Sequence, residues 1–530
     1  MNDFVKPTIE YAQLWPMLVV FGAACLGVLV EAFLPRPSRF MAQVVITVGG
    51  LIVALGGSVY VATNLDELGK GVARGDLAVM GALAIDGPTL YLWVLLLALG
   101  LAGTMLFAER ELEGGVTAFA GQASALPGTE DERLASAKGL EHTEVFPLLL
   151  LAVGGMMLFP ASNDLIMMFV ALEVLSLPLY LLSGLARRRR LLSQEAALKY
   201  FLLGAFSTGF FLYGIALIYG FAGSMEFAAI HEAVRNDTGS SALLTIGLGL
   251  LAVGLFFKVG AAPFQAWTPD VYQGAPTPLT AFMAAGTKVA AFGAMARLLY
   301  VAFGADRWSW QPMLWIIAIL TMLVGAVLAI AQSDVKRMLA YSSVAHTGFL
   351  LTGILGVQSA SDLASGEVTS LQAVLFYLTT YGFATLGAFA VVGLVRDASG
   401  EANTLSRWAG LGKESPVVAG VFALFLLAMA GIPLTSGFVG KWTVFAVALA
   451  AGAWPVVVVA ILASVIAAFF YVRVIFLMYF SDPVGDGPAV TTPSVLTSTT
   501  IGVAAALTVL LGVLPGPLLD LAGKAGEFIR

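Results

Sequence analysis

The sequence is poor in charge, histidine and cysteine. Only 11% of its 530 residues are Asp, Glu, Lys or Arg, and 59% are hydrophobic, whereas a soluble domain carries about 25% charged residues. This composition predicts an all-α polytopic membrane protein with little mass outside the bilayer. The single cysteine, Cys25, excludes disulfides, iron–sulfur clusters and cysteine-type zinc sites within the chain. With three histidines, a transition-metal cluster is not expected either.

Sequence motifs for phosphate binding, covalent catalysis and nucleic-acid binding are also missing. The 58 glycines are spread through apolar stretches, where small residues allow close helix packing, and none forms a phosphate-binding loop. No nucleophile and base are placed for covalent catalysis. We interpret the one basic run, Arg187–Arg190, as a cytoplasmic topology anchor rather than a nucleic-acid patch. The N-terminus lacks a signal-peptide layout because Asp3 and Glu10 precede the first apolar run.

A membrane-spanning helix needs about 20 predominantly apolar residues, and fourteen segments of the sequence meet that requirement. They lie near 12–33, 40–63, 88–108, 144–161, 163–184, 195–222, 241–273, 278–301, 311–332, 335–356, 369–395, 417–451, 453–479 and 495–520. Lysine and arginine are unevenly distributed between the two sets of loops, with 15 in one set and 8 in the other. Because positive residues favour the cytoplasmic side, this bias predicts that both termini lie outside.

Two of these segments, 241–273 and 417–451, are too long for one straight span and contain a proline in mid-membrane. Pro263 and Pro433 each remove a helix hydrogen bond, so the freed carbonyls must face protein or water rather than lipid. The interrupted segments are the seventh and twelfth spans, and this spacing predicts two inverted five-helix repeats, each with a broken helix. Two unrelated proline kinks are the alternative. The predicted divisions are 1–143 (three spans and a polar loop), 144–301 (first repeat), 311–479 (second repeat) and 480–530 (last span).

Six ionisable residues fall inside the predicted spans, where a charged group costs roughly 2.5–3.5 kcal/mol on insertion scales. They are Glu173, Lys199, Lys258, Lys288, His346 and Lys441. A row of such groups is expected to move a small cation across the membrane, most simply a proton. Lysine repels Na⁺ and cannot coordinate it, which favours protons over sodium. The alternative is a membrane scaffold in which the buried charges only fix helix packing.

The individual positions suggest different roles. Glu173 is the most central acidic residue, and Lys258, five residues before Pro263, is its natural partner in an ion pair that forms and loosens. A permanent structural ion pair is the alternative. Lys288 has no acid within a helical turn and is the best candidate to share and release a proton. Lys441 mirrors Lys258 in the second predicted repeat.

Two further residues have a weaker case. Lys199 lies near the start of its span, where its side chain could snorkel to the inner surface. His346 could relay protons through either ring nitrogen, or it could be a hydrogen-bonded core residue. Its neighbours Ser343 and Thr347 could line a wet path or simply satisfy the helix backbone.

Three long motifs surround these residues. They are KVGAAPFQAWTPDVYQGAPTPLT at 258–280, ALEVLSLPLYLL around Glu173 and AGIPLTSGFVGKW around Lys441. The motifs resemble those of the antiporter-like, proton-pumping subunits of respiratory complex I, and most closely the N-type subunits of bacterial NADH–quinone oxidoreductase. The resemblance extends from about residue 12 to about residue 520. The polar loop at 109–143 and the N-terminal extension are less typical, and we assign no function to them.

The resemblance implies a fold of about fourteen transmembrane helices with a proton channel along a central hydrophilic axis. It implies that Glu173 and Lys258 are the coupling pair, that Lys288 is central and that Lys441 leads to the outer exit. No cofactor or metal is expected in this chain, because the family's NADH, FMN, iron–sulfur clusters and quinone are expected in partner subunits.

The expected partners are neighbouring antiporter-like and small helical membrane subunits of complex I. The lipid of a bacterial plasma (inner) membrane would surround the chain, and no nucleic acid is expected to bind. Multi-subunit cation/proton antiporters resemble the same fold, so a subunit of such an antiporter is the alternative function.

Overall fold

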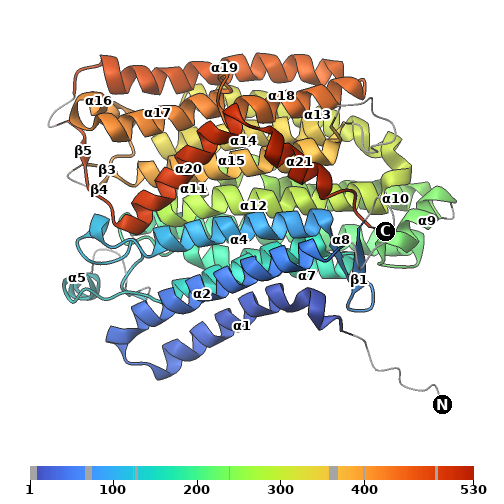
Figure 1. Cartoon of the computed structure of the whole chain (residues 1–530), viewed down its shortest axis with the longest axis horizontal. Coiled ribbons are helices and arrows are strands. Elements are labelled where there is room, and N and C mark those ends of the chain that lie inside the picture. Colours follow the sequence, from blue (N-terminus) through green and yellow to red (C-terminus); the bar gives the residue numbers. More distant parts are fainter. Residues whose placement is uncertain are drawn as a thin grey trace.

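The computed structural model describes residues 9–65, 74–122, 124–125, 129–237, 239–356, 368–397, 400–483 and 487–529, and these are mostly helical. The long helices lie side by side in one bundle, so that their ends form two opposite faces (Figure 1). Within the described part, eleven helices are long and apolar enough to cross a membrane, and three further apolar helices are shorter. The chain is therefore a multi-pass membrane protein, as its composition predicts.

The helices follow the predicted segments closely. The helices of 15 or more residues are α1 (Tyr11–Phe33), α2 (Arg36–Thr63), α4 (Gly87–Phe107), α6 (Val145–Ala161), α7 (Leu165–Ser183), α8 (Arg190–Ala222), α10 (Ser241–Val259), α12 (Thr277–Arg297), α13 (Arg307–Ile330), α14 (Val335–Ile354), α15 (Ser370–Val392), α17 (Pro416–Ala430), α18 (Ser436–Ala450), α19 (Trp454–Phe480) and α20 (Val495–Val513). Each of the fourteen predicted segments coincides with one of these helices or, at the two proline breaks, with a pair. The predicted segment 495–520 ends earlier, at Val513, because Pro515 cannot continue the hydrogen-bond ladder of α20.

Short elements cover the two ends of the bundle. The hairpin of β1 (Gly75–Ala78) and β2 (Leu83–Asp86) and the helices α9 (Phe227–Arg235) and α21 (Gly516–Lys524) lie at the same end as the start of α1 (Figure 1). The opposite end carries α5 (Glu130–Ala137), α16 (Leu411–Glu414) and a small sheet with the strand order β4 (Gly400–Glu401), β3 (Val395–Asp397), β5 (Ala489–Val490). Both ends of the described chain therefore lie on one face.

Two helices are interrupted where the sequence predicts. Helix α10 ends at Val259, and Gly260 leaves the helix with a φ of 72° before Pro263 and the short helix α11 (Trp267–Gly274). Helix α17 ends at Ala430 in the same way, with a φ of 84° at Gly431, before α18 begins. Glycine reaches this left-handed conformation without steric cost. The inverted repeats themselves stay a prediction.

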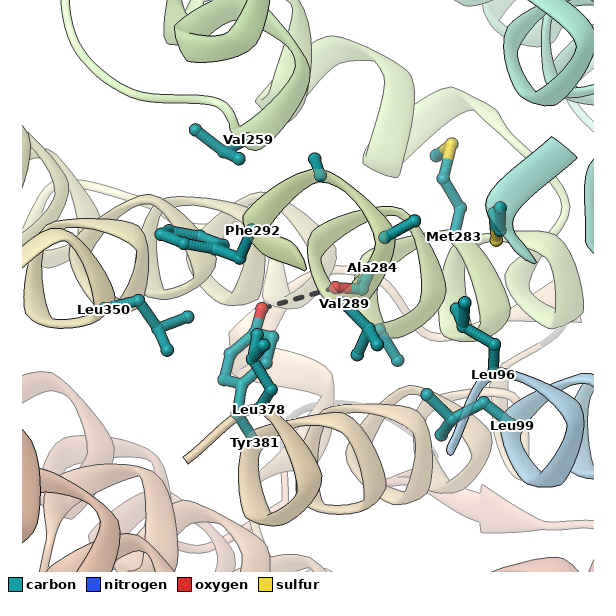
Figure 2. Close-up of a cluster of buried hydrophobic side chains, with 14 of the residues drawn as sticks. Leu96, Leu99, Val259, Met283, Ala284, Val289, Phe292, Leu350, Leu378 and Tyr381 are labelled. Carbon is teal, nitrogen blue, oxygen red and sulfur yellow. Dashed lines mark hydrogen bonds between the residues drawn. The ribbon is translucent and has the colours of Figure 1, made fainter. Parts of the chain in front are cut away.

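Helix α12 lies in the middle of the bundle and carries Lys288. All of its side chains from Leu279 to Arg297 are buried. In Figure 2, Leu96 and Leu99 of α4 and Leu378 of α15 pack against it. No face of this helix is left for lipid, so Lys288 can only be reached through the protein.

Candidate functional site

Lys288 is held by oxygen atoms at the first helix break. Its Nζ donates to the carbonyl oxygens of Val259 at 3.1 Å and Ser343 at 2.7 Å, and it also contacts Thr347 Oγ1. The Val259 carbonyl is available because its partner in an unbroken helix would be the backbone nitrogen of Pro263, which carries no hydrogen. No described carboxylate lies within 4.0 Å of the Lys288 ammonium.

Lys441 has the same arrangement at the second break. Its Nζ donates to the carbonyl of Ala430, the last residue of α17, at 3.0 Å, and to Ser464 Oγ of α19 at 2.8 Å. The Phe349 ring lies 4.8 Å from the ammonium, and only 4% of Lys441 is exposed. Each broken helix thus presents a free carbonyl to one buried lysine. The sequence analysis paired the position of Lys441 with that of Lys258. In its contacts with a backbone carbonyl and a hydroxyl group, Lys441 resembles Lys288.

His346 shares one aromatic neighbour with each of these lysines: Phe349 lies beside His346 and Lys441, and Tyr381 lies beside His346 and Lys288. Its Nδ1 is 2.6 Å from the Tyr377 hydroxyl, and its Nε2 is 3.4 Å from the Tyr471 hydroxyl. The ring centroid of Tyr381 is 5.2 Å from that of the imidazole. The residue is 2% exposed, so both ring nitrogens meet phenols in a buried setting.

Lys258 contacts hydroxyl groups rather than a carboxylate. Its Nζ donates to Ser176 Oγ at 2.8 Å and to Tyr200 OH at 3.3 Å, and the Tyr180 ring lies 6.0 Å away. Glu173 lies one helical turn before Ser176 on α7, and no described cation comes within 4.0 Å of its carboxylate. In this structure Glu173 and Lys258 therefore do not form the predicted ion pair.

Glu173 lies on the side of α7 that faces away from the bundle. The residues on the same stripe of the helix are exposed: Ile166 by 44%, Val170 by 43%, Leu177 by 50% and Leu181 by 61%. Glu173 itself is half-buried. A carboxylate placed at this depth against lipid would be costly.

Lys199 lies apart from the other predicted residues. Its side chain is 41% exposed, and its Nζ pairs with Glu195 of α8 and with Asp270 of α11, both at 2.7 Å. Asp270 also accepts from Arg337 Nη1 of α14 at 2.6 Å. This cluster connects three helices near the end of the bundle opposite the termini, and it does not join the buried lysines.

A cavity of about 470 Å³ opens at that same end of the bundle. Arg189 and Glu401 line it, together with Lys336 at the start of α14. The Lys336 ammonium donates to Ala275 O at 2.9 Å and to Thr277 Oγ1 at 3.0 Å, and lies 3.8 Å from the Glu401 carboxylate. The sequence analysis did not single out Lys336, of which only 2% is exposed.

A second buried ionic group was also missed. Arg297, which the sequence analysis did not single out, is fully buried, and its Nη2 pairs with the equally buried Asp86 at 2.7 Å. Its Nε donates to the carbonyl of Pro160 at 2.6 Å. The pair joins α12 to the start of α4, two elements too far apart in the sequence for their contact to be foreseen.

The hydroxyl partners of the buried lysines and His346 were missed as well. They are Ser176, Tyr200, Tyr377, Ser464 and Tyr471. Only Ser176 gave a local signal, since it follows Glu173 by one turn. Among the described residues, no group of three or more His, Cys, Asp or Glu side chains is placed to hold a metal ion.

Comparison with known proteins agrees with these features. Residues 162–467 match the family described as NADH:quinone oxidoreductase/Mrp antiporter, TM. A protein of Nocardioides sp. named NADH-quinone oxidoreductase subunit N is 71% identical over 532 residues, which are 100% of both chains.

Two solved structures share the fold. A chain of respiratory complex I from Thermus thermophilus, solved with bound aureothin, is 32% identical with a TM-score of 0.75, and the match covers 97% of this chain and 100% of that one. A chain of the Mrp complex from Dietzia sp. is 20% identical with a TM-score of 0.78, covering 98% and 97% of the two chains. The second likeness concerns the fold alone. By its family match and its full-length relatives, this chain belongs to the subunit N family of NADH-quinone oxidoreductase, respiratory complex I.

Proposed function

We propose that this chain carries protons across the membrane through Lys258, Lys288, His346 and Lys441, as one pumping unit of NADH-quinone oxidoreductase. Hydride and quinone chemistry, with NADH, FMN and iron–sulfur clusters, takes place in partner subunits. This chain contributes a buried series of groups that gain and lose protons.

The observation that carries the proposal is the matching environment of Lys288 and Lys441 at the two helix breaks. Each ammonium is held by a carbonyl that the break leaves free and by a hydroxyl group. A lysine paired with a carboxylate would leave an unpaired buried charge on losing its proton, which is costly. A lysine held by neutral oxygens leaves no such charge, so both of its protonation states are accessible.

In this proposal, Glu173 and Lys258 supply the change in electric field to which Lys288 responds. A unit charge about 8 Å from a buried lysine changes the energy of its charged form by about 2 kcal/mol at an effective dielectric constant of about 20. Movement of Lys258 between Ser176 and Glu173 would change its distance from Lys288 and therefore change this energy by part of that amount. Because Glu173 lies on the outward stripe of α7, a neighbouring subunit could trigger that movement.

We infer the orientation of the chain in the membrane from the distribution of basic residues. Arg396 of β3 and Lys413 of α16 lie at the end of the bundle opposite both chain ends (Figure 1). Because positive residues favour the cytoplasm, the cavity beside Lys336 faces inward and the termini face outward. Protons would enter at that cavity and leave on the side of Lys441 and the termini.

A subunit of a multi-chain cation/proton antiporter is the second candidate, and the likeness to the Mrp complex favours it. That likeness is at 20% identity, whereas the relative named subunit N of NADH-quinone oxidoreductase is 71% identical over its full length. The two candidates differ in their energy source. An antiporter subunit would move protons without NADH.

The test replaces Lys441 by methionine in the assembled complex, which keeps most of the side-chain volume and removes the charge. In inverted membrane vesicles, we expect NADH-driven proton uptake to be lost while reduction of ferricyanide by NADH, which bypasses the membrane subunits, continues. Lys413→Met is the matched control, because Lys413 is 71% exposed at its side chain and, among the described residues, pairs with Asp482 alone, at the surface. Full proton uptake in Lys441→Met would contradict the proposal.

A further inference from the structure

We infer that Tyr377 is a positioning residue that keeps the proton of neutral His346 on Nε2. The inference rests on the proposed function, because it concerns how His346 passes protons. It adds a residue that the sequence did not single out, and it gives the imidazole a defined direction between its two phenol partners.

The hydrogen-bond geometry sets the tautomer. The Tyr377 hydroxyl lies 2.6 Å from His346 Nδ1, and among the described residues this nitrogen is the one acceptor within its reach. A buried hydroxyl that does not donate loses a hydrogen bond's worth of stability. Tyr377 therefore donates to Nδ1, which must then carry its lone pair, and the hydrogen of the neutral ring is on Nε2.

Tyr471 completes the arrangement on the other side. Its hydroxyl oxygen is 3.4 Å from Nε2 and also contacts Ser342 Oγ. Nε2–H can donate to Tyr471 while the Tyr471 hydroxyl donates to Ser342. Hydrogen bonds in such a chain all point one way and polarise one another.

This order makes a balanced proton relay possible. A proton that binds the Tyr377 oxygen releases the phenolic proton to Nδ1, Nε2–H passes its proton to the Tyr471 oxygen, and Tyr471 passes its own to Ser342. One proton enters at Tyr377 and one leaves at Ser342, and no ring in between keeps a charge. The transfer leaves the hydrogen of the imidazole on Nδ1, so the ring must return to the Nε2 tautomer before the next proton passes. If Nδ1 carried the hydrogen instead, the imidazole could not accept from Tyr377.

Packing against α18 fixes the position of Tyr377. A Cβ atom added at Gly440 would lie 2.6 Å from Cδ2 of the Tyr377 ring and 3.0 Å from Thr380 Oγ1. Only glycine leaves room for the ring here, and Gly440 directly precedes Lys441. The phenol that orients His346 is therefore seated on the same helix turn as the lysine of the second break.

The test replaces Tyr377 by phenylalanine, which keeps the ring and removes only the hydroxyl. The titratable groups that face His346 are Tyr377 and Tyr381 of α15, Tyr471 of α19, Lys288 of α12 and Lys441 of α18. We expect NADH-driven proton uptake to fall about tenfold, the rate equivalent of one hydrogen bond. We also expect its pH profile to move by about one unit to higher pH, because a donor that stabilises only the neutral imidazole is lost.

Tyr300→Phe is the matched control, since its hydroxyl bonds the Ile354 carbonyl and Ser370 away from the buried lysines. That variant should keep the wild-type rate and pH profile. If Tyr377→Phe does not assemble, as judged by absence of this chain from the purified complex, Gly440→Ala tests the same point by displacing the ring, and the same shift is expected.

An unchanged pH profile in the assembled variant would overturn the inference, as would an equal shift in the Tyr300 control. His346→Gln, measured in parallel, separates this failure from that of the proposed function. If His346→Gln pumps normally, the proposed role of His346 fails. If His346→Gln does not pump but Tyr377→Phe has the wild-type rate and pH profile, only the assignment of Tyr377 fails.

Discussion

Lys258 donates a 2.8 Å hydrogen bond to Ser176, which follows Glu173 by one turn of α7. The lysine thus rests on a neutral hydroxyl within one helical turn of a carboxylate. A short movement of the flexible lysine side chain would exchange one partner for the other. We propose that the pair switches between these two arrangements, and the one without the ion pair is present here.

Removal of the Ser176 hydroxyl should disturb this switch. In Ser176→Ala, Lys258 keeps only the Tyr200 hydroxyl at 3.3 Å among its present hydrogen-bond partners. We expect about a tenfold loss of NADH-driven proton uptake, because a hydrogen bond to a charged group contributes about 1.5–3 kcal/mol. Ser183→Ala on the same helix is the control, since Ser183 donates only to the Leu179 carbonyl. Equal rates in the two variants would argue against a switching role for Ser176.

Neutralising Glu173 tests the electrical input. Glu173→Gln keeps the size and polarity of the side chain and removes the charge that draws Lys258 from Ser176. We expect proton uptake to fall at least tenfold while ferricyanide reduction by NADH continues, because the effect of one charge at about 8 Å is about 2 kcal/mol. Normal pumping in Glu173→Gln would refute the ion-pair switch, although the family assignment would stand.

The buried Arg297–Asp86 pair should be important for stability rather than for transport. Asp86→Ala leaves a fully buried guanidinium without its carboxylate, and breaking a buried pair in this way costs about 3–5 kcal/mol. We expect a lower melting temperature of the purified complex or loss of this subunit from it. Glu130→Gln serves as control, because the Glu130–Arg133 pair is about three-quarters exposed and exposed pairs contribute little. Equal melting temperatures in the two variants would contradict this account.

Asp164 gives a prediction on pH. It lies just before α7, where burial, with the Glu226 carboxylate adding to it, raises the pKa of Asp164 above its ordinary value. A raised pKa means that the folded state binds the proton more tightly. This group's stabilising contribution is therefore complete below about pH 3.9 and is lost as the pH rises through the folded pKa.

Asp164→Asn should remove that dependence while keeping an acceptor for the Met167 N–H, because asparagine also caps helices. The melting temperature of the variant minus that of the wild type should increase as the pH rises from about 4 to about 6. Parallel melting curves across this range would show that Asp164 is not the group responsible.

Much of the fold could be predicted because its signals are local. Spans follow from runs of about 20 apolar residues, and the two breaks follow from Pro263 and Pro433. The buried ionisable residues were found because charge inside an apolar run is rare. Lys288, Lys258, Lys441 and His346 are all at most 4% exposed.

The partners of these groups could not be predicted, because they are distant in the sequence. Tyr471 reaches His346 across 125 residues and Arg297 reaches Asp86 across 211. A tyrosine in an apolar helix gives no local sign of what its hydroxyl bonds. The environment of Lys199 could not be predicted for the same reason, since its partner Asp270 is 71 residues away.

The most direct test of the account is proton translocation by a complex that carries Lys288→Met. Lys288 lies on the fully buried helix α12 and is held by Val259 at the first break. We predict that purified complex in lipid vesicles reduces ferricyanide with NADH at the wild-type rate but loses proton translocation, whereas Lys413→Met keeps both. Wild-type proton translocation in the assembled Lys288→Met complex would contradict the central claim that protons pass through this lysine.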